Sequence, residues 1–253
     1  MIVARDLAPA QLDSPLGRTS PVLKLAIAVV WFVGLATTTA IGPPLVIVGV
    51  AALAAFTFGR VPFGDFVRAV APIWVAALGL ATFNTLFAAA NADPAAVTIA
   101  QLGPFRITGP ALAAGMGLGL RLIAIGAAGA VFVLTTDSTR LVDALVQQAG
   151  VSPRFAYGAL AAYQAVPRFG EDLTTLRQAR HLRGLRGDWH PRLLVSLLVL
   201  AIRHGDRVAL AMDARAFGSG PRSHYREVRW GSLDFVVGGA ALAVLVAALA
   251  LPR

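Results

Sequence analysis

The sequence contains no cysteine among its 253 residues, so a disulfide framework, a thiolate nucleophile and a cysteine metal site are all excluded. It also lacks the Gly-x-x-x-x-Gly-Lys-Ser/Thr loop that cradles nucleotide phosphates. We therefore expect a non-catalytic chain that does not hydrolyse ATP by itself. We expect no cofactor and no metal site, because the histidines are scattered without ligand spacing: His181, His190, His204 and His224.

Charged residues are scarce, at 14%, whereas 57% of the residues are hydrophobic and the mean hydropathy is +0.71. A soluble domain is closer to half apolar and a quarter charged, so this composition indicates a membrane protein. Acidic residues number only 13 against 22 basic ones, which gives a net charge of +9. Such a charge is also typical of proteins that bind nucleic acid. The positions of the basic residues favour a different explanation.

Apolar runs occur in five places along the chain, each near the roughly 20 residues that a membrane span needs. They predict an all-α membrane protein with about five transmembrane helices. The stretch before the first run has no hydrophobic core of a cleavable signal peptide, so the first span would direct insertion. The predicted spans are Val22 to Ala40, Leu45 to Phe58, Ala69 to Ala90, Ala111 to Thr135 and Leu233 to Leu251.

Basic residues collect between the fourth and fifth runs. Fourteen arginines and eight acidic residues lie from Asp137 to Arg229, whereas the segments expected outside, 41–44 and 91–107, hold one basic residue, Arg106. Cytoplasmic loops collect Lys and Arg, which predicts a cytoplasmic N-terminus in a multi-pass protein of the bacterial cytoplasmic membrane. The predicted organisation is a four-span region at 1–136, cytoplasmic coupling helices at 137–230 and a last span at 231–253. Topology then explains most of the charge, and no nucleic-acid partner is expected.

Two helices are predicted in the basic region, one from Pro153 to Gly184 and one from Pro191 to Gly218. Proline is favoured at the first position of a helix and glycine just after the last. Each helix carries an arginine at its end, in "RQARHLRG" and "AMDARAFGSG". These arginines have two interpretations. They stabilise the negative helix C-terminus, or they form planar, two-pronged bonds with carboxylates of a partner protein.

Several motifs resemble the transmembrane T component of energy-coupling-factor (ECF) transporters, the CbiQ/EcfT family. "SPLGRTSPVLKLAIAV" from Ser14 is similar to the opening of that family, and "LTTDSTRLVDAL" from Leu134 resembles the exit from its fourth span. "LGPFRIT" and "GLGLRLIAI" resemble the entry to that span. The most specific match is "ALAMDARAFG" from Ala209, which is similar to the Ala-Met-Glu-Ala-Arg-Gly-Phe signature of the family. The resemblance covers nearly the whole chain.

The resemblance implies that both arginine motifs end coupling helices that dock in grooves of two ABC-type ATPase subunits. It also implies a membrane-embedded substrate-binding partner, the S component. The sequence departs from the family pattern at Asp213, where glutamate is usual and the charge is kept, and at Ala216, where glycine is usual. The tight turn therefore has two alternative positions: at Ala216, or slightly later, where Gly218 and Gly220 could supply it. The implied docking residues are Arg215 with its neighbours Ala214 and Ala216, and Arg183 before Gly184, with Arg180 as the rival of Arg183.

One charge inside the predicted spans stands out. Arg121 lies in the fourth run, where charged residues are costly and are functional candidates. Alternatively, it bonds a backbone carbonyl or extends toward the membrane interface. Gly115 and Gly119 in the same run predict a close approach of another helix.

The predicted function is therefore a scaffold in an ATP-driven importer of a vitamin or a metal ion. The scaffold would couple ATP hydrolysis by its partners to the S component. Two alternatives are a self-contained secondary carrier and a membrane scaffold that transports nothing. The absence of an internal repeat argues against a secondary carrier. The sequence does not name the transported substrate.

Overall fold

The computed structural model describes residues 9–38, 40–103, 105–185, 187, 189–220 and 225–250. The predicted cytoplasmic N-terminal end, His224 and the final residue of the last apolar run, Leu251, lie outside these residues. The structure is 77% helical. Three of its helices are long and apolar enough to cross a membrane, and two shorter apolar helices accompany them. These features are those of an all-α membrane protein.

The chain divides into two compact units, which are described separately. The apolar unit comprises Leu7–Asp137 and Arg229–Arg253, and the basic unit comprises Ser138–Val228 with residues 1–6. The elements of the apolar unit are α1 (Pro9–Leu12), α2 (Pro15–Arg18), α3 (Pro21–Ala36), α4 (Gly42–Leu53), the π-helical turn η1 (Ala54–Phe58), α5 (Phe63–Phe87), the short 3₁₀ helix η2 (Ala89–Ala92), β1 (Thr98–Leu102), β2 (Phe105–Thr108), α6 (Gly109–Leu134) and α10 (Ser232–Leu249).

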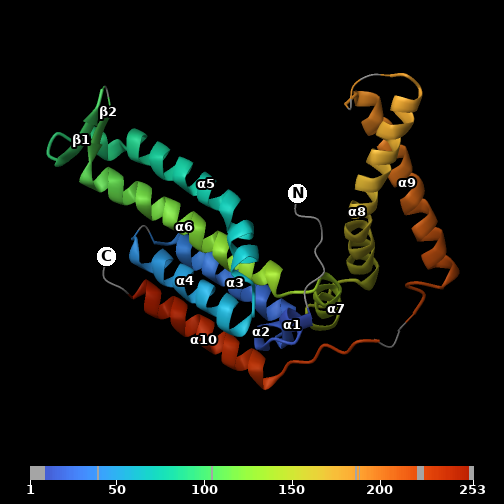
Figure 1. The fold of residues 1–253 in the computed structure, drawn as a ribbon. Helices are drawn as coiled ribbons and strands as arrows, with labels where there is room; N and C mark the ends of the chain where they lie inside the picture. The colour runs from blue at the N-terminus through green and yellow to red at the C-terminus, as the bar shows by residue number, and fades with distance from the viewer. Residues whose placement is uncertain are drawn as a thin grey trace. The chain divides into compact units, whose positions relative to one another are not determined.

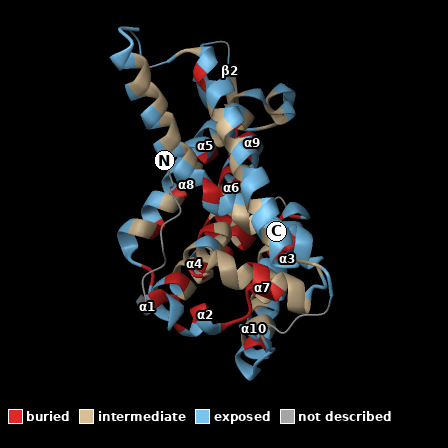
Figure 2. Cartoon of the chain, turned by 90° about the vertical axis from the view of Figure 1, so that its right-hand side faces the viewer, coloured by how far each residue is buried: buried red, intermediate tan, exposed pale blue. Residues whose placement is uncertain are grey.

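Helix α6 lies at the centre of the apolar unit and packs against α3, α4 and α5, while α10 packs against α3 and α4 (Figure 1). Buried residues follow α6 in Figure 2. The closest packing is between α5 and α6, where Gly115, Gly119 and Gly126 of α6 face α5. A Cβ at Gly119 would lie 2.9 Å from Cβ of Ala81, and one at Gly115 would lie 2.6 Å from the carbonyl oxygen of Ala81. The close helix approach predicted at these two glycines is therefore confirmed.

The helices match the predicted apolar runs to within a few residues, except that α5 begins at Phe63, six residues before its predicted start. The sequence analysis did not predict the antiparallel hairpin β1–β2 between α5 and α6, where Gln101 pairs with Arg106. This segment was interpreted only as a break between spans. Its two strands are five and four residues long, so they give only a short alternating pattern.

The basic unit contains α7 (Ser138–Gln148), α8 (Pro153–Leu182) and α9 (Pro191–Ala214). Helices α8 and α9 begin at the two predicted prolines. They lie side by side (Figure 1). The ring centroids of Phe169 and His204, near the middles of the two helices, are 6.2 Å apart. Among the described residues, α8 buries only Ala156 and Ala165, and α9 only Leu193. Most of both helices is therefore available to contact other molecules.

Candidate functional site: two arginine-ended helices

Helix α8 ends at Arg183, which occupies the C-cap position. The next residue, Gly184, has φ +73°, a left-handed conformation that glycine adopts without steric cost. The N–H of Gly184 donates to the carbonyl of His181 at 2.9 Å, and the N–H of Leu185 donates to that of Arg180 at 3.3 Å. This pair of bonds is a Schellman motif, which satisfies the last carbonyls of the helix.

Helix α9 ends in the same way at Arg215, its C-cap residue. The N–H of Ala216 donates to the carbonyl of Asp213 at 2.8 Å, and the N–H of Phe217 donates to that of Met212 at 3.0 Å. The left-handed position is Ala216, with φ +54°, although its Cβ makes this conformation costly. Of the two alternatives for this turn, the structure therefore has the one at Ala216. The helix-ending hydrogen bonds fix the turn directly after Arg215.

Arg183 and Arg215 thus hold equivalent positions, each at the C-cap and each one residue before a left-handed turn. Both residues are exposed. Arg180 lies one turn earlier in α8 and is only partly exposed. Ala214, the last residue of α9, is exposed beside Arg215.

The two arginine ends lie at opposite ends of the α8–α9 pair. Arg154 in the first turn of α8 donates to the carbonyl of Gly218 at 2.8 Å, and the rings of Tyr157 and Phe217 meet at 6.3 Å. The beginning of α8 therefore lies beside the end of α9. Since α8 has 30 residues, the two ends are separated by about 45 Å, at 1.5 Å per residue.

A buried hydrogen bond joins α7 to the beginning of α8. The hydroxyl of Tyr157 donates to Oδ1 of Asp143 at 2.7 Å, and Asp143 is only 7% exposed. Desolvation by burial, then this hydrogen bond and the negative charge of Asp143, raise the pKa of Tyr157 to about 12. The phenol therefore keeps its proton at all physiological pH values and acts as a fixed donor.

Arg121 lies in α6, and its Nη2 donates to the carbonyl oxygen of Thr38, just after the end of α3. The side chain is partly buried, and its Nε atom is buried without a hydrogen-bond partner. The cation thus contacts the negative C-terminal end of a helix, where positive charge is stabilising. This contact is the backbone-carbonyl alternative considered for Arg121.

Two further charged residues were not recognised from the sequence as buried. Lys24 of α3 is 7% exposed, and Asp234 of α10 is 4% exposed. Both lie at the ends of predicted spans, where the sequence gives no sign of whether a charge is buried. Across the described ranges, no three His, Asp or Glu side chains come together as a metal site.

The fold defines an all-α membrane protein with a basic helical unit in which α8 and α9 each end at an exposed arginine. The model of the cobalt transport protein family CbiQ matches residues 13–225. The chain therefore belongs to the CbiQ/EcfT family, the transmembrane T components of ECF transporters.

Similar proteins carry corresponding names. The energy-coupling factor transporter transmembrane protein EcfT of Heliobacterium modesticaldum is 29% identical over 93% of this chain and 92% of its own. The EcfT of Clostridium kluyveri is 27% identical over 92% and 91%, respectively. A putative ABC transporter ATP-binding protein of Bifidobacterium longum is 26% identical over 60% of this chain, which corresponds to 22% of that protein.

Proposed function

We propose that this T component couples ATP hydrolysis by two ABC-type ATPase subunits to a membrane-embedded S component, which binds a vitamin or a metal ion for import. The chain itself catalyses nothing. It receives movement at its two arginine ends and transmits it to the membrane helices.

The observation that carries this proposal is the equivalence of the two exposed arginines. Each arginine lies at a helix end that is closed by the same pattern of hydrogen bonds. A helix length of about 45 Å separates the two ends. That spacing suits two separate subunits better than one groove. A guanidinium presents a planar fork that pairs with carboxylates in a defined orientation.

The ATP-binding relative gives independent support for an ATPase partner. A region similar to this chain makes up only about a fifth of a protein named as an ABC transporter ATP-binding protein. In that relative, the similar region is joined covalently to the rest of the ATP-binding protein.

Arg183 is the first docking residue in this proposal, and Arg180 is not. Arg183 shares both its helix position and its exposure with Arg215, whereas Arg180 is partly buried one turn earlier. Its neighbour Gly184 leaves the end of the helix narrow, as do Ala214 and Ala216 at the second end.

The proposed topology has five spans with the N-terminus and the basic unit in the cytoplasm. The beginnings of α3 and α10 lie beside the end of α6, as the hydrogen bonds of Ser20 and Lys24 show, which is the arrangement that alternating spans require. The division into units supports the proposed regions 1–136, 137–230 and 231–253. The first half of α9 exposes apolar side chains suited to the membrane interface: Leu194, Val195, Leu198, Val199 and Ile202.

A cysteine-labelling experiment tests this topology. A cysteine at Asp93, between α5 and α6, should react with an impermeant reagent added outside intact cells. A cysteine at Glu171 in α8 should react only after the membrane is opened. The reverse pattern would contradict the proposed orientation.

Docking is tested by purifying the chain in mild detergent together with its partner ATPase subunits. We expect the double change Arg183→Ala and Arg215→Ala to remove the ATPases, because losing one partner of a buried ion pair costs about 3–5 kcal/mol. Lysine at both positions should restore binding only in part, because it keeps the charge but lacks the fork. The matched control is Arg168→Ala with Arg203→Ala, which removes two exposed charges from the middles of the same helices.

Wild-type yield of ATPases with the double variant would contradict docking and leave helix capping as the role of these arginines. Capping predicts only a small loss of stability, about 0.3–1 kcal/mol per helix. Substrate uptake by the chain in vesicles without ATPases would instead favour a self-contained carrier.

A further inference from the structure

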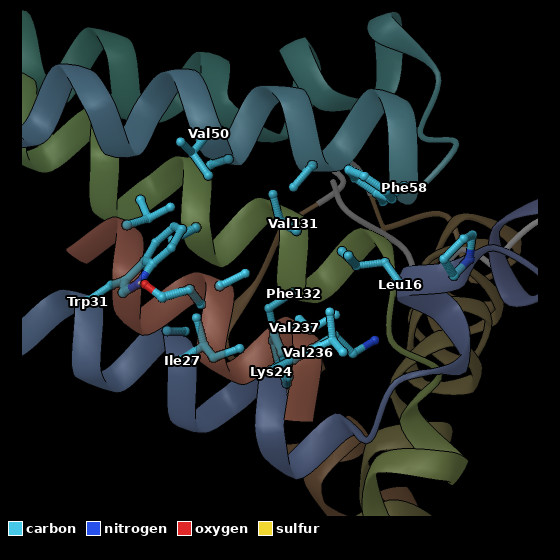
Figure 3. Close-up of a pocket in the computed structure, with 18 of the residues that line it drawn as sticks. Leu16, Lys24, Ile27, Trp31, Val50, Phe58, Val131, Phe132, Val236 and Val237 are labelled. Atoms are coloured by element: carbon cyan, nitrogen blue, oxygen red, sulfur yellow. The ribbon is translucent and has the colours of Figure 1, made fainter. Parts of the chain in front are cut away.

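The chain has a single lysine, Lys24, and that lysine is buried. It lies in the first turns of α3, and its Nζ donates to the carbonyl oxygen of Thr135 at 2.7 Å and contacts the Thr135 hydroxyl at 3.4 Å. Figure 3 shows Lys24 among the apolar side chains Phe132, Val236 and Val237. A buried ammonium group is costly unless hydrogen bonds compensate it, so this contact is needed to hold the lysine there.

Asp234 makes a matching contact at the beginning of α10. Its Oδ1 accepts from the backbone N–H of Ser20 at 2.7 Å, and its Oδ2 accepts from that of Gly231 at 2.8 Å. One carboxylate therefore caps α10 and fastens it to the residue before α3. Hydrogen bonds to a charged group are about twice as strong as neutral ones.

Both contacts lie where the chain passes between its two units. Thr135 directly follows α6, and the chain leaves the apolar unit after Asp137. It returns at Arg229, and Asp234 lies in the first turn of α10. Residues 20–24, the N-cap and first turn of α3, therefore contact both chain segments that connect residues 138–228 to the apolar unit.

We propose that Lys24 and Asp234 are positioning residues for energy coupling, because together they fix the two connections that flank residues 138–228, which include the arginine-ended helices, to the beginning of α3. This inference rests on the proposed function. A movement that the ATPases impose on α8 and α9 reaches the membrane helices through those two connections. Because Lys24 and Asp234 hold both connections against the beginning of α3, the movement shifts α3 instead of bending the connections.

The movement does not stop at the first turn of α3. Nε1 of Trp31, farther along that helix, donates to the carbonyl of Ala241 in α10 at 3.1 Å. Gly34 of α3 lies against the side chain of Leu245, so the two helices remain packed over their length. Helices α3 and α10 therefore move together when their first turns move.

The central test measures ATP hydrolysed per substrate imported by the whole transporter in vesicles. Lys24→Met keeps the apolar stem but removes the donor, and Asp234→Asn removes one of the two acceptor oxygens. We expect each variant to assemble with its ATPases and hydrolyse ATP, but to use about tenfold more ATP per substrate. Lys24→Arg should recover part of the coupling. The control Arg68→Met removes an exposed cation at the beginning of α5 and should leave the ratio unchanged.

A ratio equal to wild type in both variants would overturn the inference while leaving the proposed function intact. A parallel fall of assembly, hydrolysis and import, without a change in the ratio, would also overturn it, because it indicates a merely structural role. If the wild-type chain itself neither binds ATPases nor imports with ATP, the proposed function fails instead.

A second measurement tests the contact of Lys24 without substituting Lys24 or Asp234. An amine-reactive reagent has only Lys24 and the N-terminal amine to modify in this chain, and peptide mass spectrometry distinguishes the two. In the resting transporter, Lys24 should react at least about tenfold more slowly than a lysine introduced by Arg168→Lys on the exposed face of α8. Equal rates would show that the contact with Thr135 does not keep the amine of Lys24 buried, and would overturn the inference.

Discussion

Arg154 donates a hydrogen bond from Nη2 to the carbonyl oxygen of Gly218 at 2.8 Å. Gly218 has no side chain to obstruct the guanidinium, and a Cβ there would lie 3.1 Å from Cγ of Arg154. The first turn of α8 therefore supports the turn that follows Arg215. The arginine end of α9 is thus supported by α8, the helix that carries the other arginine end.

This brace predicts the effect of Arg154→Ala. Losing one charge-assisted hydrogen bond at the surface should reduce the stability of the α9 end by about 0.5–1.5 kcal/mol. Hydrogen exchange at the amide of Phe217 should become correspondingly faster, while exchange at Gly184, at the other end, stays unchanged. Equal acceleration at both amides would show that Arg154 stabilises the whole helix pair instead of one end.

A second prediction concerns the left-handed alanine. Ala216→Gly should stabilise the end of α9 by about 1 kcal/mol, because glycine adopts a positive φ without the Cβ clash. Slower exchange at the amides of Ala216 and Phe217 would measure this gain. The matched control is Ala214→Gly, which places glycine inside the helix and should cost about 0.5–1 kcal/mol. Destabilisation by both substitutions would contradict the assigned turn.

Tyr157 gives a pH prediction. Its pKa is raised from 10.0 to about 12, first by desolvation and then by Asp143, so the folded state binds this proton more tightly than the unfolded state. The resulting stability is fully present below pH 10 and is lost as the pH rises toward 12. The difference in phenolate absorbance between wild type and Tyr157→Phe should therefore show a midpoint near 12. Asp143→Asn should lower that midpoint, and an unchanged value would contradict the role of Asp143.

The last prediction concerns Arg121. Arg121→Met removes the donor to the buried residue Thr38, so the connection between α3 and α4 should lose about 1–3 kcal/mol of local stability. We expect weaker association of the S component with normal retention of the ATPases, measured by co-purification. Arg106→Met, which removes the cation of the β hairpin, is the control. Loss of the ATPases together with the S component would indicate a global folding defect instead.

The helix-forming parts of this chain were predictable because their signals are local. Apolar runs of span length, Pro153, Pro191 and Gly184 specify helices or their ends through composition and backbone preference alone. The sequence left the position of the turn after Arg215 open between Ala216 and the glycines that follow it. Residue preference favours glycine there, but the hydrogen bonds that close α9 decide the position.

The sequence by itself determined the membrane class, the apolar runs and the arginines at the two helix ends. Only the tertiary structure decided that Arg183 and Arg215 lie at opposite ends of one helix pair. It also decided that Lys24 is buried against Thr135, which is 111 residues away in sequence. A charge at the end of a span has the same local sequence whether it faces water or a carbonyl. Its burial depends on which distant backbone group reaches it, and only packing among α3, α6 and α10 brings that group within hydrogen-bonding distance.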